Sequence, residues 1–530
     1  MIKGYINGKI FTSNDDNLYA EAMMVQDGLI TWIGKIENFE KDACAQVVDL
    51  EGKCVIPGFV DAHMHPVMLA DFSKKISCLP PKINSVEELV EAVKEYRKGL
   101  KPGQWIEGWG YDEGKFAEKR SPNRYDLDKG CADVPVSILR TCGHIRCVNS
   151  KALELAGITK DTPDPQGGKI DRDENGEPTG VLRENARNLV TAIMPSPSKD
   201  EVIEEIVDLG KLLLSQGIVA VTDMGNLDDT DSYVYFNEAV QRGFKQEVGV
   251  YYFWETFKDK PEFKLDKKHF DRNKQIRVAG LKLIGDGSFS GHTAWVDEPY
   301  LGTEDYGISV CSDELLDTAI EFCKEHKCQL SAHAMGGRTI SRMVDVAYKE
   351  ESWTEEEIPY FRVEHVTEPT ELSIDKAVKK GIWFVTQPIF AYCEIESYLT
   401  NLGEERTKRV YPVKHMLERG VKLAFSTDAP ATSWAVPSDP FSNLKSAVTR
   451  VAYDGTDCGM DQIIDIETAI KLYTDKSAQV AGFKNLGMLK EGYKADFIVL
   501  SDDIFDIKPE DTDKVKVEQT YILGEKVYQL

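Results

Sequence analysis

The stretch VIPGFVDAHMHP, residues 55–66, decides the fold. Its apolar and β-branched residues are typical of a short buried strand, with Pro57-Gly58 marking its start and Pro66 standing just past its end. Successive side chains of a strand alternate between its two faces, so His63 and His65 point the same way. Two convergent neutral imidazoles at the carboxyl end of a strand are a natural beginning of a metal site. Alone the pair is weak evidence, because a polar strand-to-loop turn has the same pattern.

Length, charge and cysteine usage limit the class of protein. A chain of 530 residues is too long for one ordinary core and predicts two or more structural units. The formal net charge of −25 argues against nucleic acid and anionic membranes as partners. The sequence has neither an apolar signal region near its start nor a run of eighteen uncharged apolar residues. Together with eleven scattered cysteines that form no CxxC pair, this predicts a cytoplasmic protein with reduced thiols.

Both ends of the chain have the pattern of short strands joined by tight turns. Asn7-Gly8 and Asp27-Gly28 in the first segment are typical hairpin dipeptides. Each end alone would leave an unpaired apolar face. We therefore expect residues 1–57 and 484–530 to form one small β-sandwich domain.

The middle of the chain alternates strands with helices, as a parallel barrel does. The expected strands are Phe59–His63, Val219–Asp223, Glu247–Phe253, Ala279–Gly285, Gln329–His333, Arg362–His365, Trp383–Thr386 and Lys422–Thr427. Eight strands close a (β/α)8 TIM-type barrel, here over residues 58–483. The interval 67–198 is too long for one crossover, so we expect an insertion after the first barrel strand, placed over the active-site mouth.

The predicted strands carry six side chains that can bind a metal or move a proton: His63, His65, Lys282, His333, His365 and Asp428. In a parallel barrel the carboxyl ends of the strands share the catalytic face. Taken singly, each has a bland explanation, since a histidine can be a satisfied core residue, an aspartate can begin a turn and a lysine can extend to solvent. Taken together, four imidazoles and a carboxylate at one barrel mouth predict a metal site.

This set of donors suits Zn²⁺, with Mn²⁺ or Fe²⁺ as alternatives, in a site of one or two ions. The metal lowers the pKa of a bound water towards ~7 and so provides hydroxide near neutral pH. Asp428 can take the proton of that water and deliver it to a leaving nitrogen. A buried, neutral Lys282 can add carbon dioxide and become a carbamate that bridges two metals.

Longer stretches carry a family resemblance: VIPGFVDAHMHP, CGHIRCVNSKALELAGI, DPQGGKIDRDENGEPTGVLRENA, GLKLIGDGSFSGHTAWVDEPY, SAHAMGGRTI, VEHV, FSTDAPATSWAVPSDPF and NLGMLKEGYKADFIVL. In this order they resemble the amidohydrolase superfamily, in the branch of metal-dependent hydrolases that includes N-substituted formamide deformylases. The resemblance covers essentially the whole chain and implies a barrel with a β-sandwich. It also implies attack of a metal-bound hydroxide on a non-peptide carbon–nitrogen bond. On the family pattern the inner metal is held by His63, His65 and Asp428, the outer one by His333 and His365, and both by carbamylated Lys282.

The substrate is predicted less directly. The insertion contributes Trp109, Asp112, Arg140 and His144 as expected substrate contacts, and its aromatic residues would suit an apolar group on the substrate nitrogen. The alternative is that these aromatics form the insertion's own core. Two departures from the family pattern flank the mouth: Gly337 stands where an acid is usual, and His292 stands where an arginine is usual. His292 is a further expected substrate contact, with an extra metal ligand or a surface loop residue as the alternatives.

Three functions remain open on the sequence. The first is hydrolysis of an N-substituted amide or formamide. The second is hydrolytic deamination of a heterocycle, which relatives often perform with one metal and without the lysine. The third is a non-enzymatic barrel scaffold, which the complete ligand set argues against. The expected partner is a small-molecule substrate, and the assembly we consider is a homodimer.

Overall fold

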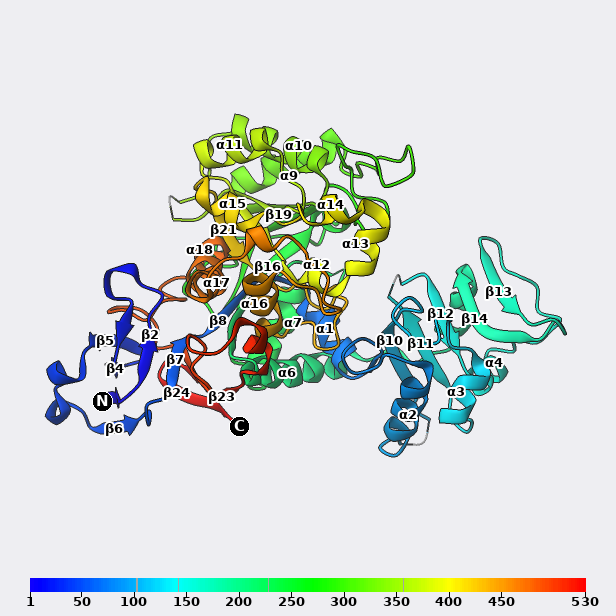
Figure 1. Ribbon diagram of the computed structural model, residues 1–530, viewed down its shortest axis with the longest axis horizontal. Helices are drawn as coiled ribbons and strands as arrows, with labels where there is room; N and C mark the ends of the chain where they lie inside the picture. Colours follow the sequence, from blue (N-terminus) through cyan, green and yellow to red (C-terminus); the bar gives the residue numbers. More distant parts are fainter. Residues whose placement is uncertain (102, 142, 227, 356) are drawn as a thin grey trace. The chain divides into compact units, whose positions relative to one another are not determined.

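The computed structural model describes every residue except 102, 142, 227 and 356 (Figure 1). The chain divides into two compact units. The first contains residues 1–67, 206–432 and 438–530, and the second contains residues 68–205 and 433–437.

The first unit is built on a sheet of eight parallel strands. In spatial order they are β21 (Lys422–Phe425), β20 (Trp383–Thr386), β19 (Phe361–His365), β18 (Gln329–Ala334), β17 (Ile276–Ile284), β16 (Glu247–Phe253), β15 (Ile218–Asp223) and β8 (Phe59–Met64). At the carboxyl ends of β8 and β21, the amide of Asp428 donates to the His63 carbonyl and the amide of His65 donates to the Ala429 carbonyl, each at 2.8 Å. These bonds nearly close the sheet into a barrel. The arrangement is consistent with the (β/α)8 barrel expected from the sequence.

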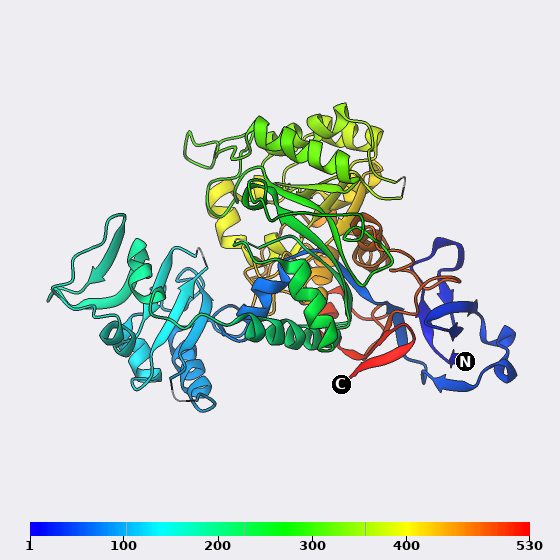
Figure 2. The ribbon, with the colours of Figure 1, turned by 180° about the vertical axis from the view of Figure 1, so that it is seen from behind.

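Helices cover the outside of this sheet (Figures 1 and 2). The longer ones are α6 (Lys199–Ser215), α7 (Ser232–Gln241), α9 (Asp313–His326), α10 (Gly337–Lys349), α11 (Glu371–Lys380), α13 (Ile395–Leu402), α16 (Pro440–Thr449), α17 (Ile466–Tyr473) and α18 (Asp475–Ala481). Shorter ones are α8 (Trp254–Phe257), α12 (Ile389–Cys393), α14 (Glu404–Thr407) and α15 (Val413–Glu418), while α1 (Pro66–Ser73) follows β8 directly. Side chains begin several of them, for example Ser312 at α9 and Thr370 at α11, because a hydroxyl oxygen can accept from a free amide of the first turn.

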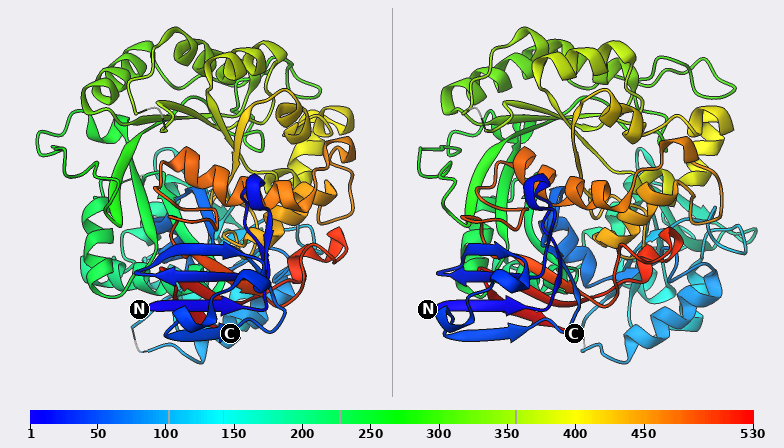
Figure 3. Two further views of the ribbon diagram at one scale, coloured as in Figure 1. Left: turned by 90° about the vertical axis from the view of Figure 1, so that its left-hand side faces the viewer. Right: turned by 60° about the vertical axis from the view of Figure 1, so that its left-hand side comes forward.

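Strands from both ends of the chain pair with each other in the first unit. One sheet has the order β24 (Glu525–Gln529), β23 (Val517–Ile522), β22 (Phe497–Leu500), β7 (Cys54–Pro57), β2 (Lys9–Phe11) and β3 (Tyr19–Ala20). The other has the order β5 (Leu29–Gly34), β4 (Ala22–Gln26), β1 (Ile2–Ile6) and β6 (Gln46–Asp49). Figure 3 shows these blue and red strands side by side, and the rings of Tyr5, Phe497 and Tyr521 pack in their common core. The boundaries of a separate domain at residues 1–57 and 484–530 stay a prediction.

The second unit has a sheet of its own. Its order is β13 (Gly168–Arg172), β14 (Pro178–Glu184), β12 (Ile145–Val148), β11 (Val136–Arg140), β10 (Ile106–Tyr111) and β9 (Ile76–Ser77). Its helices are α2 (Val86–Arg97), α3 (Arg124–Gly130), α4 (Ser150–Leu155) and α5 (Asn188–Thr191). Leu89, Ile106, Phe116 and Ile138 are fully buried in its core. The segment that the sequence marked as an insertion thus folds around its own core, and its placement over the barrel mouth stays a prediction.

None of the helices in the described part of the chain is long and apolar enough to cross a membrane.

A buried carboxyl group lies where the two ends of the chain meet. Asp496 Oδ1 accepts a 2.6 Å hydrogen bond from the amide of Leu523. Burial raises the pKa of Asp496 to about 7, well above its ordinary value. The folded protein therefore binds this proton more tightly than the unfolded chain does. The resulting contribution to the free energy of unfolding is fully present below about pH 4 and is lost as the pH rises through about 7.

Asp496→Asn is therefore expected to raise the melting temperature at pH 8 by about 4 °C and to leave it nearly unchanged at pH 4. The amide oxygen keeps an acceptor for Leu523 without a buried charge. Thermal unfolding at the two pH values measures the effect, with the exposed Asp502→Asn as the control. An equal gain at both pH values would contradict the explanation.

Candidate metal centre

One cluster of metal-binding side chains lies inside the barrel. It contains residues from the carboxyl ends of β8 and β21 and a lysine of β17. His63 Nε2 lies 3.3 Å from Lys282 Nζ and 3.3 Å from Asp428 Oδ1. His65 Nε2 lies 3.4 Å from the same carboxylate oxygen. All four residues were predicted as metal ligands, and the fold brings them together across large sequence separations.

The imidazoles of β18 and β19 lie against this cluster. The ring centroids of His365 and His63 are 4.8 Å apart, and those of His333 and His365 are 4.3 Å apart. Ligand atoms of His63, His365 and Asp428 all lie within 4.8 Å of one another, and all three residues are buried. The six predicted ligands therefore converge on one place, while their binding of a metal stays a prediction.

Each of the four histidines has one ring nitrogen held by an oxygen acceptor. The pairs are His63 Nδ1 with Glu364 Oε2 at 2.8 Å, His65 Nδ1 with the Gly225 carbonyl at 2.7 Å, His365 Nδ1 with Gln387 Oε1 at 2.9 Å, and His333 Nε2 with the Gly287 carbonyl at 3.0 Å. An acceptor requires the hydrogen to be on that nitrogen, so in a neutral ring the other nitrogen carries the free lone pair. This is how ligand histidines are usually oriented towards a metal.

The backbone around the cluster is held in uncommon conformations. His365 has φ 73° and Asp428 has φ 58°, in the left-handed region that non-glycine residues seldom adopt. Buried Asp61, two residues before His63, accepts from the Thr427 hydroxyl and from the Tyr473 hydroxyl, each at 2.6 Å. Strain of this kind persists where the surroundings fix it, which is common at functional sites.

Burial and the neighbouring charges set the protonation of the cluster. Burial lowers the pKa of Lys282 to about 8 and that of His333 to about 4, and it holds the pKa of His365 well below its ordinary value. Burial alone would raise the pKa of Asp428, but the nearby imidazoles bring it well below the usual range. Burial opposes charge on His65 as well, but the Asp428 carboxylate raises its pKa. Near neutral pH the cluster thus holds neutral His333 and His365 rings, an ionised Asp428 carboxylate and a lysine with an appreciable neutral fraction.

These donors fit a divalent metal. Asp428 Oδ1 is buried and has no hydrogen-bond donor among the described residues, so a cation is the partner that this oxygen lacks. Imidazole and carboxylate together are the ligands of zinc-type ions rather than of calcium or magnesium.

The four predicted substrate contacts of the second unit each have partners there. Trp109 is buried and its ring packs against Phe72 at 4.8 Å. Arg140 pairs with Glu113 at 2.9 Å and lies 3.8 Å from Asp112. His144, mostly exposed, pairs with Glu184 at 3.0 Å. The alternative that aromatics such as Trp109 belong to the unit's own core gains support, and the substrate contacts stay a prediction.

The fifth predicted contact, His292, lies in the loop after β17. Its ring stacks on Tyr300 at 4.6 Å, and its Nε2 donates to Asn401 Oδ1 at 2.7 Å. The imidazole thereby fastens the loop to α13. Contact with a substrate stays a prediction for this residue too.

Sequence reasoning missed the residues that orient the ligands: Asp61, Glu364 and Gln387. A signal was present for one of them, because Arg362 and Glu364 alternate with apolar residues in β19 and so share the face that points into the barrel. Charged residues on that face need partners, which predicts a buried network. The acceptors of the other histidines are backbone carbonyls or an amide, for which the sequence has no comparable signal.

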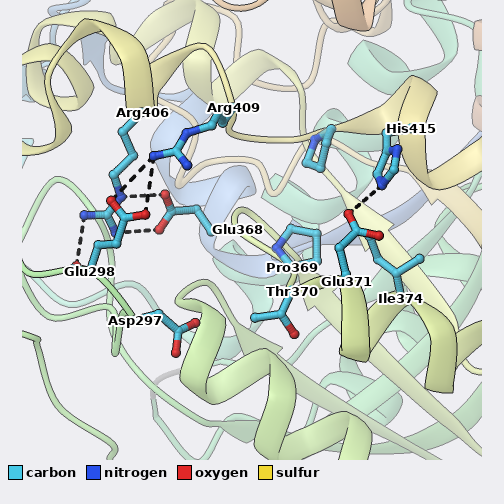
Figure 4. A pocket seen from close by; sticks show the side chains of 11 residues that line it. Asp297, Glu298, Glu368, Pro369, Thr370, Glu371, Ile374, Arg406, Arg409 and His415 are labelled. Carbon is cyan, nitrogen blue, oxygen red and sulfur yellow. Dashed lines mark hydrogen bonds and ion pairs between the residues drawn. The ribbon is translucent and has the colours of Figure 1, made fainter.

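A separate pocket of about 350 Å³ lies beside the loop after β19 (Figure 4). Its basic side chains are already paired with carboxylates: Arg406 with Glu368 at 2.6 Å, Arg409 with Glu298 at 3.5 Å and His415 with Glu371 at 2.7 Å. We assign no ligand to this pocket.

Comparisons with known proteins agree with the geometry. A family model described as "Amidohydrolase family" matches residues 46–528. YtcJ of Bacillus subtilis (strain 168) is 29% identical, with 98% of each chain covered. The N-substituted formamide deformylase of Arthrobacter pascens is 27% identical, with 99% of this chain and 98% of that protein covered. Among solved structures, an uncharacterised metal-dependent hydrolase from Pyrococcus horikoshii OT3 matches with a TM-score of 0.73 and 26% identity, over 96% of this chain and 99% of that one.

Proposed function

The chain belongs to the amidohydrolase family and is a hydrolase of non-peptide carbon–nitrogen bonds, and from this premise we propose that it cleaves an N-substituted amide or formamide with the help of a bound metal. The observation that carries the proposal is the convergence of four oriented imidazoles, a carboxylate and a buried lysine at one end of the barrel. Similarity to a formamide deformylase over nearly the full length supports the choice of substrate.

The residues that would hold one or two ions are His63, His65, His333, His365 and Asp428, together with Lys282 in the form of a carbamate. A zinc-type ion, Zn²⁺ in our proposal with Mn²⁺ or Fe²⁺ as alternatives, would lower the pKa of a water and polarise the amide carbonyl. The His333 and His365 rings are already neutral, so they need not lose a proton to act as ligands.

Asp428 is the proposed proton carrier. Its Oδ1 has no donor among the described residues and can accept the proton of the attacking water. The same carboxyl then delivers that proton to the leaving nitrogen, so the amine departs neutral. Thr427 and Asp61 hold the backbone on which this side chain is carried.

Lys282 is suited to carbamate formation because its amine is partly neutral. A neutral amine is the form that adds carbon dioxide, and burial provides it. The Nζ atom lies 3.3 Å from His63 Nε2, the ring nitrogen opposite the one that donates to Glu364. A carbamate adds one carboxylate group to the amine, and its two oxygens would be anionic donors for a metal held beside these imidazoles.

We further propose an apolar or aromatic group on the substrate nitrogen. Trp109, Asp112, Arg140, His144 and His292 are the residues we propose to contact the substrate. Two rings of the first unit support an apolar mouth: Phe253 stacks on His65 at 6.3 Å and Phe390 stacks on His365 at 6.1 Å. We also propose a cytoplasmic homodimer without nucleic-acid or membrane partners, and a β-sandwich domain formed by the two terminal segments.

Hydrolysis assays on a panel of N-formyl, N-acyl and cyclic amides test the proposal, with heterocyclic amines as the deaminase arm. Metal-depleted protein reconstituted with Zn²⁺ or Mn²⁺ is expected to hydrolyse N-substituted formamides or amides, and the His63→Ala/His65→Ala variant is expected to lose both metal and activity. Release of ammonia from heterocyclic amines alone would favour the deaminase. A reproducible absence of metal and of any turnover would favour the scaffold.

A further inference from the structure

We propose that Glu364 is a positioning residue that fixes the ring and tautomer of His63 for metal binding. The inference rests on the proposed function, since it concerns how this chain prepares one of the proposed ligands. Neither the family match nor the predicted ligand set assigns a role to this glutamate.

The contact between the two side chains is short and fully enclosed. Glu364 Oε2 lies 2.8 Å from His63 Nδ1, with side-chain exposures of 0% and 1%. Because a carboxylate only accepts, the hydrogen must be on Nδ1, and in the neutral ring, which is the form that binds a metal, the Nε2 lone pair then faces Lys282 and Asp428. The other three histidines donate to backbone carbonyls or an amide at comparable distances, and the Asp286 carboxylate lies farther from His333 Nε2, at 3.4 Å. A carboxylate acceptor makes the ring a stronger ligand than a neutral acceptor does.

Glu364 is itself held from two sides. Its Oε1 accepts from the Ser331 hydroxyl at 2.8 Å and from Arg362 Nε. Its Oε2 accepts from Arg362 Nη2 at 3.0 Å, and the same Nη2 donates to the Ala62 carbonyl at 2.6 Å. Ala62 precedes His63 in β8. One arginine therefore ties the carboxylate of β19 to the backbone that carries the ligand.

The competing explanation is that Glu364 only neutralises the buried Arg362. Neutralisation would be achieved by a carboxylate on the arginine alone, without a bond to His63. The two roles can be separated by removing the charge pair and then varying only the acceptor that faces the imidazole. Replacing a buried ion pair by apolar residues of similar volume is often neutral for stability, whereas removing one partner is strongly destabilising.

The experiment compares two charge-free variants, Arg362→Met/Glu364→Leu and Arg362→Met/Glu364→Gln. Leucine leaves His63 Nδ1 without an acceptor, whereas the glutamine amide oxygen can still accept from it. Zn²⁺ affinity of the metal-depleted proteins is measured by chelator competition, and the melting temperature of the metal-free proteins reports on the fold. We expect the leucine variant to bind Zn²⁺ about 10–100-fold more weakly than the wild type. The glutamine variant is expected to recover most of that loss at a similar melting temperature.

Equal Zn²⁺ affinities of the leucine variant and the wild type would overturn the inference, and so would equal weakness of the leucine and glutamine variants. If the leucine variant does not fold, the Glu364→Asp variant provides the test. Aspartate keeps a negative charge beside Arg362, but its side chain is one methylene shorter, so its carboxylate lies farther from His63. We expect it to weaken Zn²⁺ binding about tenfold, and unchanged affinity would overturn the inference. A wild-type protein that binds no Zn²⁺, Mn²⁺ or Fe²⁺ would instead overturn the proposed function itself.

Discussion

Replacing Asp428 with asparagine is expected to lower kcat for the best amide substrate by about 10³-fold or more. Two effects combine in this estimate. General acid–base catalysis by a positioned carboxyl contributes about 10²–10⁴-fold, and asparagine cannot take a proton from water. The substitution also removes the negative charge that His63 Nε2 and His65 Nε2 face at 3.3 and 3.4 Å, so metal binding weakens too.

Steady-state kinetics and metal analysis of the same samples separate these effects. Saturating Zn²⁺ is expected to refill the site of Asp428→Asn without restoring kcat, because the proton carrier is still missing. The matched control is Asp475→Asn, a buried aspartate at the start of α18 whose carboxylate pairs with Lys476 and Gln479. Retention of more than a tenth of wild-type kcat in Asp428→Asn would exclude this carboxyl as the proton carrier.

The sequence was sufficient to predict the eight barrel strands, because a buried parallel strand is a continuous apolar run between turn residues. Its errors are at the ends of the strands. β17 begins at Ile276 rather than at Ala279, since Arg277 interrupts the apolar pattern but remains in the strand with its guanidinium on the Ala481 carbonyl. β21 ends at Phe425 rather than at Thr427, where the chain already bends towards the positive φ of Asp428.

The candidate ligands could be predicted because barrel topology places every strand end at one face. Their orientation could not. The partner of His63 lies 301 positions away, and the partner of Asp61 lies 412 positions away. Such pairs form between inward-facing side chains that lie at the same level along the barrel axis. The alternation of residues in a strand predicts which side chains face inward, but it does not predict their level relative to those of other strands. Four of the five predicted substrate contacts belong to the second unit, which has its own core. Aromatic and charged residues in that unit can therefore serve its packing as well as substrate binding, and the sequence does not distinguish the two roles.

Replacing Lys282 with alanine is expected to lower kcat about 10²-fold or more and to reduce the metal content from two ions to one per chain. The lysine Nζ lies among the imidazoles of the barrel interior, 3.3 Å from His63 Nε2, and is fully buried. As a carbamate, Lys282 would supply negative charge to both ions, so its loss would leave the ion held by His333 and His365 with neutral ligands only and would leave the repulsion between two cations uncompensated. A metal ion contributes several kcal/mol of charge stabilisation in the transition state, which sets the size of the effect.

Lys282→Glu is the control that separates bridging from packing. Glutamate places a carboxylate on the same strand position, so a bridging role predicts recovery of part of the second metal equivalent and of kcat relative to Lys282→Ala. A role in packing predicts the reverse, because an unpaired carboxylate in this buried position is more costly than a methyl group. Metal analysis and kinetics on the amide panel measure both variants. Full activity of Lys282→Ala with one metal ion would instead favour the deaminase, because a one-metal mechanism needs the imidazoles and Asp428 but not the lysine.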